Sequence, residues 1–342
     1  MTRRRRRLLA LGLGFALVGA LEGGARLLAS RDSRWNVFIG GSREFDPVRG
    51  QRLKRGYVSG EIHTSALGTL GRDFTPARAP GVFRIVVLGD SCAFMPPARP
   101  WPLVLEERLR ASGHAVEVVN ASCPGYDSFQ ARAWYEDEVS TWDHDALVVS
   151  VGWNDLAQYN PWGLAYKLRE RGYLPEPSLL QRALISSYFL RSLYVVEGSL
   201  ERRGAVSRAP LTDDDRARLA AFTPVRYEEN LAAIVRRAGG RPVFLIGLAG
   251  LIKKDATEAE EGRMDFPRGM GKSIERFVAT RDLYRAAQGR VGGVRLVDLA
   301  PLFPDEESRR VFTDRVHFDA RGAEQVGQRV AEAVAPVVTS TR

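Results

Sequence analysis

The sequence predicts an α/β fold in which helices cover both faces of a parallel sheet. Short, uninterrupted apolar segments alternate with longer segments that carry helical signals, a pattern typical of strands buried on both faces. At 342 residues with 44% apolar content, the chain can bury one large core. These observations favour one main domain with insertions over two separate domains.

The predicted elements follow one another regularly from residue 83 onward. Strands are expected at residues 83–89, 115–119, 146–151, 241–248 and 294–299. Helices are expected at residues 102–112, 128–140, 227–238 and 320–334. In a flavodoxin-like strand order the first strand is central and the next two flank it. The loops after these three strands would then open onto one crevice at their carboxyl ends.

Residues 1–29 are predicted to be a targeting element outside the fold. Five consecutive arginines at 3–7 precede the uncharged apolar run 8–21, and a weaker continuation to residue 29 carries Glu22 and Arg26. Positive charge stays on the cytoplasmic side, so the rest of the chain is expected to be periplasmic or extracellular. A run this short suits a cleaved signal, whereas reading on to residue 29 gives about 20 residues, enough for a spanning helix. We expect a membrane anchor through residues 8–29, with secretion after signal cleavage as the alternative.

Charge and composition distinguish two segments after residue 29. Five of the nine net positive charges lie in residues 3–7, so the body is only mildly basic and carries no nucleic-acid footprint. Residues 30–80 are rich in Arg, Gly and Ser and are interpreted as an irregular linker or cap. Residues 81–338 form the predicted main domain, with an insertion at about 156–225.

The first predicted strand ends in Gly-Asp-Ser, where an open α/β sheet presents a nucleophile to its substrate. Ser91 would need an imidazole to take its proton and a carboxylate to orient that imidazole. Of the four histidines, His63 precedes the sheet, and His114 and His144 lie in turns at the end opposite Ser91. His317 is therefore the candidate base.

Two carboxylates lie close to the candidate base in the sequence. Asp314 precedes His317 by three residues in the same loop, and Asp319 follows it by two. We favour Asp314 as the orienting group, since it could reach the ring nitrogen that faces away from Ser91. The three candidate catalytic residues thus come from the two ends of one domain.

A tetrahedral intermediate needs hydrogen-bond donors aimed at its oxyanion. The loops after the first three strands offer the backbone N–H of Ser91, the backbone N–H of Gly125 and the side-chain amide of Asn154. Asp90 is expected to cap a helix that begins at Ser91. Asp155 is expected to make local turn or packing contacts.

Four sequence blocks carry a resemblance to a known family. The chain resembles the SGNH, or GDSL-type, hydrolase superfamily over about residues 65–335, through Gly89-Asp90-Ser91, the Gly125 loop, Gly152-Trp153-Asn154-Asp155 and Asp314-Arg315-Val316-His317. The resemblance implies a three-layer α/β/α sandwich with a five-stranded sheet, and ester hydrolysis through an acyl-enzyme. It also implies that Ser91 is the nucleophile, His317 the base and Asp314 its orienter, with Ser91, Gly125 and Asn154 as oxyanion donors. Residues 92–97 depart from the family pattern, which usually has a glycine-containing loop there.

The insertion is where substrate choice is expected to be encoded. Residues 179–196 carry apolar side chains at helical spacing, which favours a helix packed on the sheet over an acyl-binding lid or a membrane-dipping element. Tyr159, Trp162 and Tyr166 could stack on a sugar ring, but aromatic side chains at such positions are equally often core.

The two cysteines lie in loops that the strand order makes neighbours. Cys92 follows Ser91, and Cys123 precedes Gly125 by two residues; a disulfide and two buried free thiols both remain open. The scattered histidines and cysteines show no zinc-ligand spacing and no Gly-rich phosphate loop is present, so no metal or cofactor is expected.

The predicted function is that of a serine esterase acting on carbohydrate O-acyl or lipid-like esters. The substrate would be a small-molecule or polysaccharide ester, and no nucleic-acid partner is expected. An extracytoplasmic O-acyltransferase with the same catalytic residues is the first alternative. A non-enzymatic scaffold of the cell envelope is the second.

Overall fold

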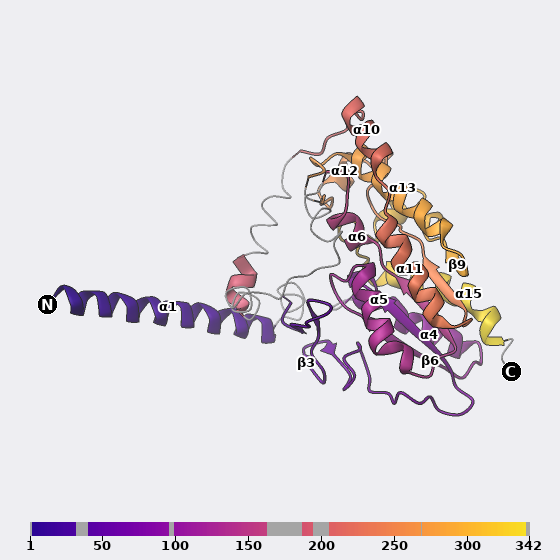
Figure 1. Cartoon of the computed structure of the whole chain (residues 1–342), viewed down its shortest axis with the longest axis horizontal. Coiled ribbons are helices and arrows are strands. Elements are labelled where there is room, and N and C mark those ends of the chain that lie inside the picture. Colours follow the sequence, from indigo (N-terminus) through magenta and orange to yellow (C-terminus); the bar gives the residue numbers. More distant parts are fainter. Residues whose placement is uncertain are drawn as a thin grey trace.

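The computed structural model describes residues 2–31, 40–95, 99–162, 187–193, 205–267 and 269–339. One long helix, α1 (Arg3–Arg31), projects from a body that is formed by most of the other described residues (Figure 1). The centre of the body is a five-stranded parallel sheet with the order β6-β5-β7-β8-β9. Its strands are β5 (Phe83–Gly89), β6 (Val116–Ser122), β7 (Ala146–Ser150), β8 (Val243–Ile246) and β9 (Val294–Val297). The first strand of the sheet, β5, lies between the second and third, β6 and β7, as the flavodoxin-like order predicts.

Helices cover both faces of this sheet. On one face α4 (Trp101–Ala111) packs against α15 (Ala320–Thr339) and β6. On the other face α5 (Ser128–Asp137) packs against β5 and α11 (Val225–Ala238), which in turn contacts α13 (Ile274–Arg290). The fold is therefore a three-layer α/β/α sandwich (Figure 1).

Shorter elements occupy the loops. They are α3 (Ser91–Phe94), η1 (Val139–Thr141), α6 (Trp153–Gln158), α10 (Asp213–Ala221), α12 (Glu258–Glu261), η2 (Ala300–Leu302) and α14 (Glu306–Arg309). Before the sheet lie two antiparallel ribbons: β1 (Arg43–Glu44) with β2 (Arg52–Leu53), and β3 (Val58–Ser59) with β4 (Ile62–His63).

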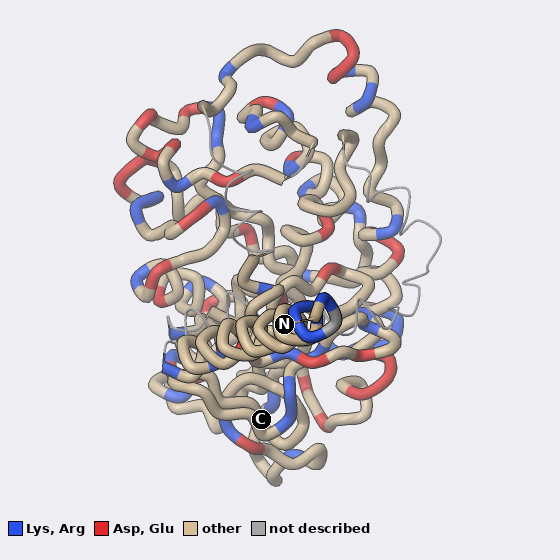
Figure 2. The backbone as a smooth tube through the Cα atoms, turned by 90° about the vertical axis from the view of Figure 1, so that its left-hand side faces the viewer, with Lys and Arg blue, Asp and Glu red and all other residues tan. Residues whose placement is uncertain are grey.

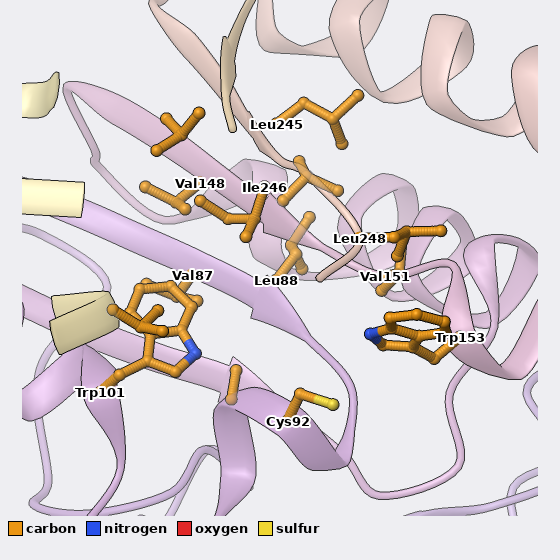
Figure 3. Packing of buried hydrophobic residues seen from close by; sticks show 14 of the residues in the cluster. Val87, Leu88, Cys92, Trp101, Val148, Val151, Trp153, Leu245, Ile246 and Leu248 are labelled. Carbon is orange, nitrogen blue, oxygen red and sulfur yellow. The ribbon is translucent and has the colours of Figure 1, made fainter. Parts of the chain in front are cut away.

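The core lies along the central strands. All seven residues of β5 are buried. Figure 3 shows Val87 and Leu88 of β5 together with Val148, Leu245 and neighbouring side chains, with the Trp101 and Trp153 rings at the two sides of the group. Full burial of such aliphatic side chains contributes roughly 1.5–3 kcal/mol each, so the central strands form a rigid base for the loops that follow them.

The predicted strands and long helices match the structure closely, but one long helix and several short elements, among them α10, were not predicted. Helix α13 was not expected, although Ile274, Phe277, Val278 and Tyr284 fall at helical spacing and are all buried. The hydroxyl of Ser273 accepts from the backbone N–H of Arg276 and caps the helix. β6 ends three residues later than predicted, and β8 and β9 are shorter than predicted.

The ribbons of residues 40–80 pack on the main domain. The Gln130 amide donates to the Arg49 carbonyl at 2.6 Å, and the Tyr126 hydroxyl donates to the Gln51 carbonyl at 2.8 Å. Arg55 forms an ion pair with Glu138. Of the two interpretations left open for this stretch, we therefore propose a cap rather than a linker.

The insertion differs from expectation where it is described. Most of the helix predicted at 179–196, and Tyr166, lie outside the described residues. Residues 188–193 are helical, but they pack beside α1 and the turn that precedes β1. The expected packing on the sheet is therefore wrong for this part. Trp162 donates its indole N–H to Asp215 at 3.1 Å, which accounts for it as a packing residue.

Helix α1 is the one candidate membrane span among the described residues. Its segment Arg5–Arg31 is long and apolar enough to cross a membrane. Figure 2 looks at the molecule from the side of this helix and shows basic residues gathered at its N-terminal end. The uncharged stretch that follows is solvent-exposed along most of its length.

Candidate active site

Ser91 lies at the point where the central strand gives way to helix α3. The carboxylate of Asp90 accepts from the backbone N–H of Cys92 at 2.8 Å and caps this short helix, as predicted. Gly89 allows the close approach of helix α3, because a Cβ there would lie 2.7 Å from the Cβ of Ala93. The serine hydroxyl is thereby held at the carboxyl end of the sheet.

The departure in residues 92–97 has a structural counterpart. Met95 ends α3 with a φ of 61°, a left-handed conformation that favours glycine. Its side chain is buried, with 6% of its surface exposed. A buried methionine therefore occupies a turn position that a glycine would adopt without strain.

Ser91, His317 and Asp314 form one continuous hydrogen-bonded line. Nε2 of His317 lies 2.8 Å from Oγ of Ser91, and Nδ1 lies 2.6 Å from Oδ2 of Asp314. Oδ1 of Asp314 also accepts the backbone N–H groups of Val316 and His317, both at 2.9 Å. These two bonds fix the carboxylate and the imidazole in one tight turn.

The charges of the site favour a protonated imidazole. Burial opposes protonation of His317, but the hydrogen bond and charge of Asp314 outweigh it and raise the pKa of His317 above its ordinary value of 6.5. Burial likewise opposes ionisation of Asp314, yet its bonds to His317 and to the backbone hold its pKa well below the usual range. Asp314 therefore stays ionised and can stabilise an imidazolium.

The other titratable candidates are placed away from Ser91. Oδ1 of Asp319 accepts from the N–H of Gly322 at 2.9 Å, at the start of α15. The ring of His144 is buried, 3.1 Å from the Tyr135 hydroxyl and 2.6 Å from the Trp142 carbonyl. His63 lies in β4, and His114 precedes β6 at the far end of the sheet.

Two backbone donors at the site are open. Within the described residues, neither the N–H of Ser91 nor the N–H of Gly125 has a hydrogen-bond acceptor. Their loops are neighbours, since Gly89 pairs with Ser122 and the Cys123 N–H donates to the Gly89 carbonyl at 3.0 Å. Gly125 has a φ of +83°, the left-handed region that glycine adopts without strain.

Asn154 also reaches this position. Its Nδ2 donates to the Tyr126 carbonyl at 3.0 Å and lies 3.5 Å from Oδ2 of Asp90. The second contact is long, so this N–H is the one free to turn toward an oxyanion. Asp155 is buried and accepts from Ser128 through both its N–H and its hydroxyl, at 2.9 and 2.5 Å.

Buried acids behind the site hold its loops together. Burial, with a further contribution from the charge of Asp127, raises the pKa of Asp155 to about 8. Burial also raises the pKa of Asp90 to about 6, against the hydrogen bond from Cys92. Asp155 joins α6 to the start of α5, which makes it the packing partner that was predicted.

The two cysteines are free thiols in the structure. The thiol of Cys92 donates to the Val316 carbonyl at 3.6 Å and so joins the loop of Ser91 to the loop of His317. Burial and the charges of Asp90 and Asp314 raise the pKa of Cys92 well above its usual range, which keeps the donor proton in place. Of the two states left open by the sequence, the structure contains the free thiols.

Two residues near the site were missed at the level of sequence. The side chains of Arg43 and Gln51, from the first ribbon, both donate to the carbonyl of Pro124, next to Gly125. They lie 81 and 73 residues before Pro124, and no local pattern marks them. No group of three or more potential metal ligands occurs within the described part of the chain.

The chain is similar to one protein family and to several solved structures. The model of the GDSL-like lipase/acylhydrolase family matches residues 87–325, which is more than half of the chain. A search of curated proteins gave no match. Among solved structures, a GDSL-like lipase from Parabacteroides merdae is 15% identical with a TM-score of 0.42, over 74% of this chain and 95% of that one.

Two further solved structures are similar at the same level. The lipase/acylhydrolase from Enterococcus faecalis is 17% identical with a TM-score of 0.39, over 74% of this chain and 95% of that one. An acetyl xylan esterase is 16% identical with a TM-score of 0.42, over 74% of this chain and 100% of that one. On the strength of the family match, the chain belongs to the GDSL-like lipase/acylhydrolase family and is a serine hydrolase that acts on ester bonds.

Proposed function

We propose that this enzyme hydrolyses acyl esters, of carbohydrate O-acyl or lipid-like type, through an acyl-enzyme on Ser91. The observation that carries the proposal is the hydrogen-bonded line from Oγ of Ser91 through His317 to Asp314, with contacts of 2.8 and 2.6 Å. The two open N–H groups of Ser91 and Gly125 support it. A scaffold protein would have no need of this arrangement.

In the first half of the reaction, Oγ of Ser91 attacks the ester carbonyl carbon while its proton passes to Nε2 of His317. The carbonyl oxygen becomes an oxyanion that accepts from the N–H groups of Ser91 and Gly125 and from the Asn154 amide. The imidazolium is stabilised by ionised Asp314. It then returns the proton to the alkoxy oxygen, and the C–O bond breaks. The alcohol departs, and the acyl group remains on Ser91 as an ester.

In the second half, an acceptor hydroxyl attacks the acyl carbon while His317 takes its proton, and Oγ of Ser91 leaves with that proton. Water as acceptor gives the free acid. A sugar hydroxyl as acceptor would give acyl transfer instead, by the same residues. The acceptor that wins defines the enzyme as a hydrolase or a transferase.

The test is turnover of short and long p-nitrophenyl esters by the full chain, with and without a sugar acceptor. We expect release of nitrophenol and free acid in equal amounts, and an acyl-enzyme visible by intact mass. Ser91→Ala should show neither. Nitrophenol release that outpaces free acid when sugar is present would establish the transferase, and full turnover by Ser91→Ala would overturn the mechanism.

We further propose that the catalytic domain is tethered outside the cytoplasm by residues 8–29. Glu22 of α1 accepts from the Ser187 hydroxyl at 2.8 Å and from the N–H groups of Tyr188 and Phe189 at 3.1 and 3.0 Å. Ala25 and Ala29 of the same helix are buried. Signal cleavage after Ala25 would remove Glu22 and these contacts, so they favour a retained anchor.

Fractionation with intact-mass measurement tests the location. We expect the full-length chain in the membrane fraction, with the domain accessible to protease added from outside the membrane. A soluble mature form that begins near Arg26 would replace the anchor with a cleaved signal. A domain protected by the cytoplasm would contradict export altogether.

A further inference from the structure

Two side chains of the β1–β2 ribbon form hydrogen bonds to the Gly125 loop. Nη1 of Arg43 donates to the Pro124 carbonyl at 3.2 Å, and Nε2 of Gln51 donates to the same oxygen at 3.0 Å. Nη1 of Arg43 also donates to Oε1 of Gln51 at 2.9 Å. The two side chains therefore orient each other as well as the loop.

Further contacts lock the ribbon to this loop. The Tyr126 hydroxyl donates to the backbone carbonyl of Gln51 at 2.8 Å. A Cβ added at Gly125 would lie 3.0 Å from Nε2 of Gln51, so the side chain rests directly on the glycine. Residues 124–126 thus have little freedom to move away from the ribbon.

The Pro124 carbonyl, which accepts from Arg43 and Gln51, and the open N–H of Gly125 belong to one peptide group. The C=O of Pro124 and the N–H of Gly125 are the two ends of the same planar amide, whose C–N bond has partial double-bond character. A carbonyl that accepts from a cation draws electron density from the amide nitrogen, which makes the N–H at the other end a stronger donor. Hydrogen bonds to Pro124 therefore strengthen a bond that Gly125 makes.

The charge that acts on this amide is not cancelled nearby. No carboxylate among the described residues forms an ion pair with Arg43, whereas its neighbour on the ribbon, Arg52, pairs with Glu44 at 2.8 Å. Burial lowers the pKa of the Arg43 guanidinium, but a guanidinium stays charged in proteins. A positive charge beside the amide favours negative charge on the far side of it.

We infer that Arg43 and Gln51 are positioning residues of the oxyanion hole, which act through the Pro124–Gly125 peptide group to orient and strengthen the Gly125 N–H. The inference rests on the proposed triad and oxyanion donors, and it extends the active site to a ribbon that precedes the hydrolase sheet. Neither side chain is required to touch the substrate. Their effect should fall on the transition state and leave substrate binding unchanged.

Three variants separate polarisation from bracing. Arg43→Met removes the charge at similar length, and Arg43→Lys keeps a charge and a donor. Gln51→Glu has nearly the same shape, but it removes the donor to Pro124 and neutralises Arg43 by pairing with it. Arg52→Gln is the matched control, since it breaks an exposed ion pair on the same ribbon without touching the loop.

The first readout is steady-state turnover of p-nitrophenyl acetate by the full chain, alongside thermal unfolding. Removing a direct oxyanion donor costs about 10²–10³ in kcat, so an indirect effect should cost less, about tenfold for Arg43→Met and Gln51→Glu. KM should stay within about twofold, because only the transition state carries the oxyanion. Arg43→Lys should recover most of kcat, and Arg52→Gln should match the parent.

The second readout is spectroscopic. Oγ of Ser91 adds to the carbonyl carbon of a trifluoromethyl ketone that is labelled with ¹³C at this carbon, and the Ser91 proton passes to His317. The former carbonyl oxygen becomes a hemiketal oxygen in the oxyanion hole. The ¹³C shift as a function of pH gives the pKa of that hemiketal hydroxyl. We expect a higher pKa in Arg43→Met and Gln51→Glu than in the parent, because the anion has lost stabilisation.

The outcomes separate this inference from the function beneath it. Parent-like kcat and hemiketal pKa in Arg43→Met and Gln51→Glu, with Ser91→Ala inactive, would overturn the inference and leave the triad standing. A lower unfolding temperature with an unchanged hemiketal pKa would reduce the two residues to a structural brace. Activity in Ser91→Ala would overturn the triad itself.

Discussion

The two loops that flank the central strand's carboxyl end are built in opposite ways. The loop of Ser91 is shaped by its own neighbours, since Asp90 caps the N–H two residues later. The loop of Gly125 is shaped by Arg43 and Gln51, which lie 81 and 73 residues before the carbonyl that they contact. One loop is locally encoded, and the other depends on a distant ribbon.

This difference separates what supplies the chemistry from what tunes it. The locally encoded loops of Ser91 and His317 hold the groups that we propose form bonds and move protons. The Gly125 loop holds a proposed donor, and we infer that its direction and strength depend on a part of the chain outside the hydrolase sheet. Damage to the first kind of loop should abolish catalysis, and damage to the second should weaken it by degrees.

The largest effects are expected from the locally encoded loops. Ser91→Ala and His317→Ala should each lower kcat by at least about three orders of magnitude, because no acyl-enzyme forms without the nucleophile or its base. Asp314→Asn should also be severe, since an amide favours the wrong imidazole tautomer. Turnover of p-nitrophenyl esters checks all three.

The controls for these variants are the other histidines. His114→Ala and His144→Ala lie at the far end of the sheet and should leave kcat nearly unchanged, although His144→Ala should lower stability by opening a buried site. An active His317→Ala beside an inactive His144→Ala would mean that the wrong histidine has been assigned.

An intermediate effect is expected at the remotely braced loop. Gly125→Ala places a Cβ against the Gln51 amide in a backbone conformation with φ +83°, so the loop must shift and its N–H turns away. Kcat should fall about 10- to 100-fold, less than for the triad. Gly113→Ala is the control, because Gly113 has a φ of +82° and a Cβ added there would meet open space.

The two glycine variants should lose similar stability and differ in activity. The left-handed backbone costs each alanine about 1 kcal/mol of unfolding free energy, which chemical denaturation measures. Equal kcat values in Gly113→Ala and Gly125→Ala would show that the Gly125 N–H does not take part in catalysis.

The same distinction explains how far the sequence could predict the molecule. The strand order and the positions of Ser91, His317 and Asn154 follow from buried strands and from motifs of a few residues, whose geometry is local. Residues 40–53 have no such signature, because a two-residue strand buries too little to impose a hydrophobic period. The partners of Arg43 and Gln51 depend on tertiary packing, which no spacing along the chain encodes.

The acidic side of the pH profile should also report the local loop. His317 must be neutral to accept the Ser91 proton, and its pKa is raised above 6.5. As pH falls through that raised pKa, the imidazole becomes protonated and kcat/KM declines. We expect the midpoint of the acidic limb above 6.5, measured with p-nitrophenyl acetate over a range of buffers. A midpoint below 6.5 would mean that Asp314 does not stabilise the charged ring.

The smallest expected effect comes from Asp90, whose charge contributes to the raised pKa of His317. Burial raises the pKa of Asp90 to about 6, so the carboxylate is mostly ionised where His317 titrates. Asp90→Asn keeps a side chain that caps helices well but removes the charge. The imidazolium then loses stabilisation, and the midpoint of the acidic limb should move down by a fraction of a pH unit. The plateau should fall as well, because the new amide meets the Asn154 amide, so the midpoint is the readout.

Asp319→Asn is the control. The charge of Asp319 faces Arg321 at the start of α15, and the acidic limb of this variant should coincide with that of the parent. A coincident limb in Asp90→Asn would show that the charge beside Ser91 does not reach the base.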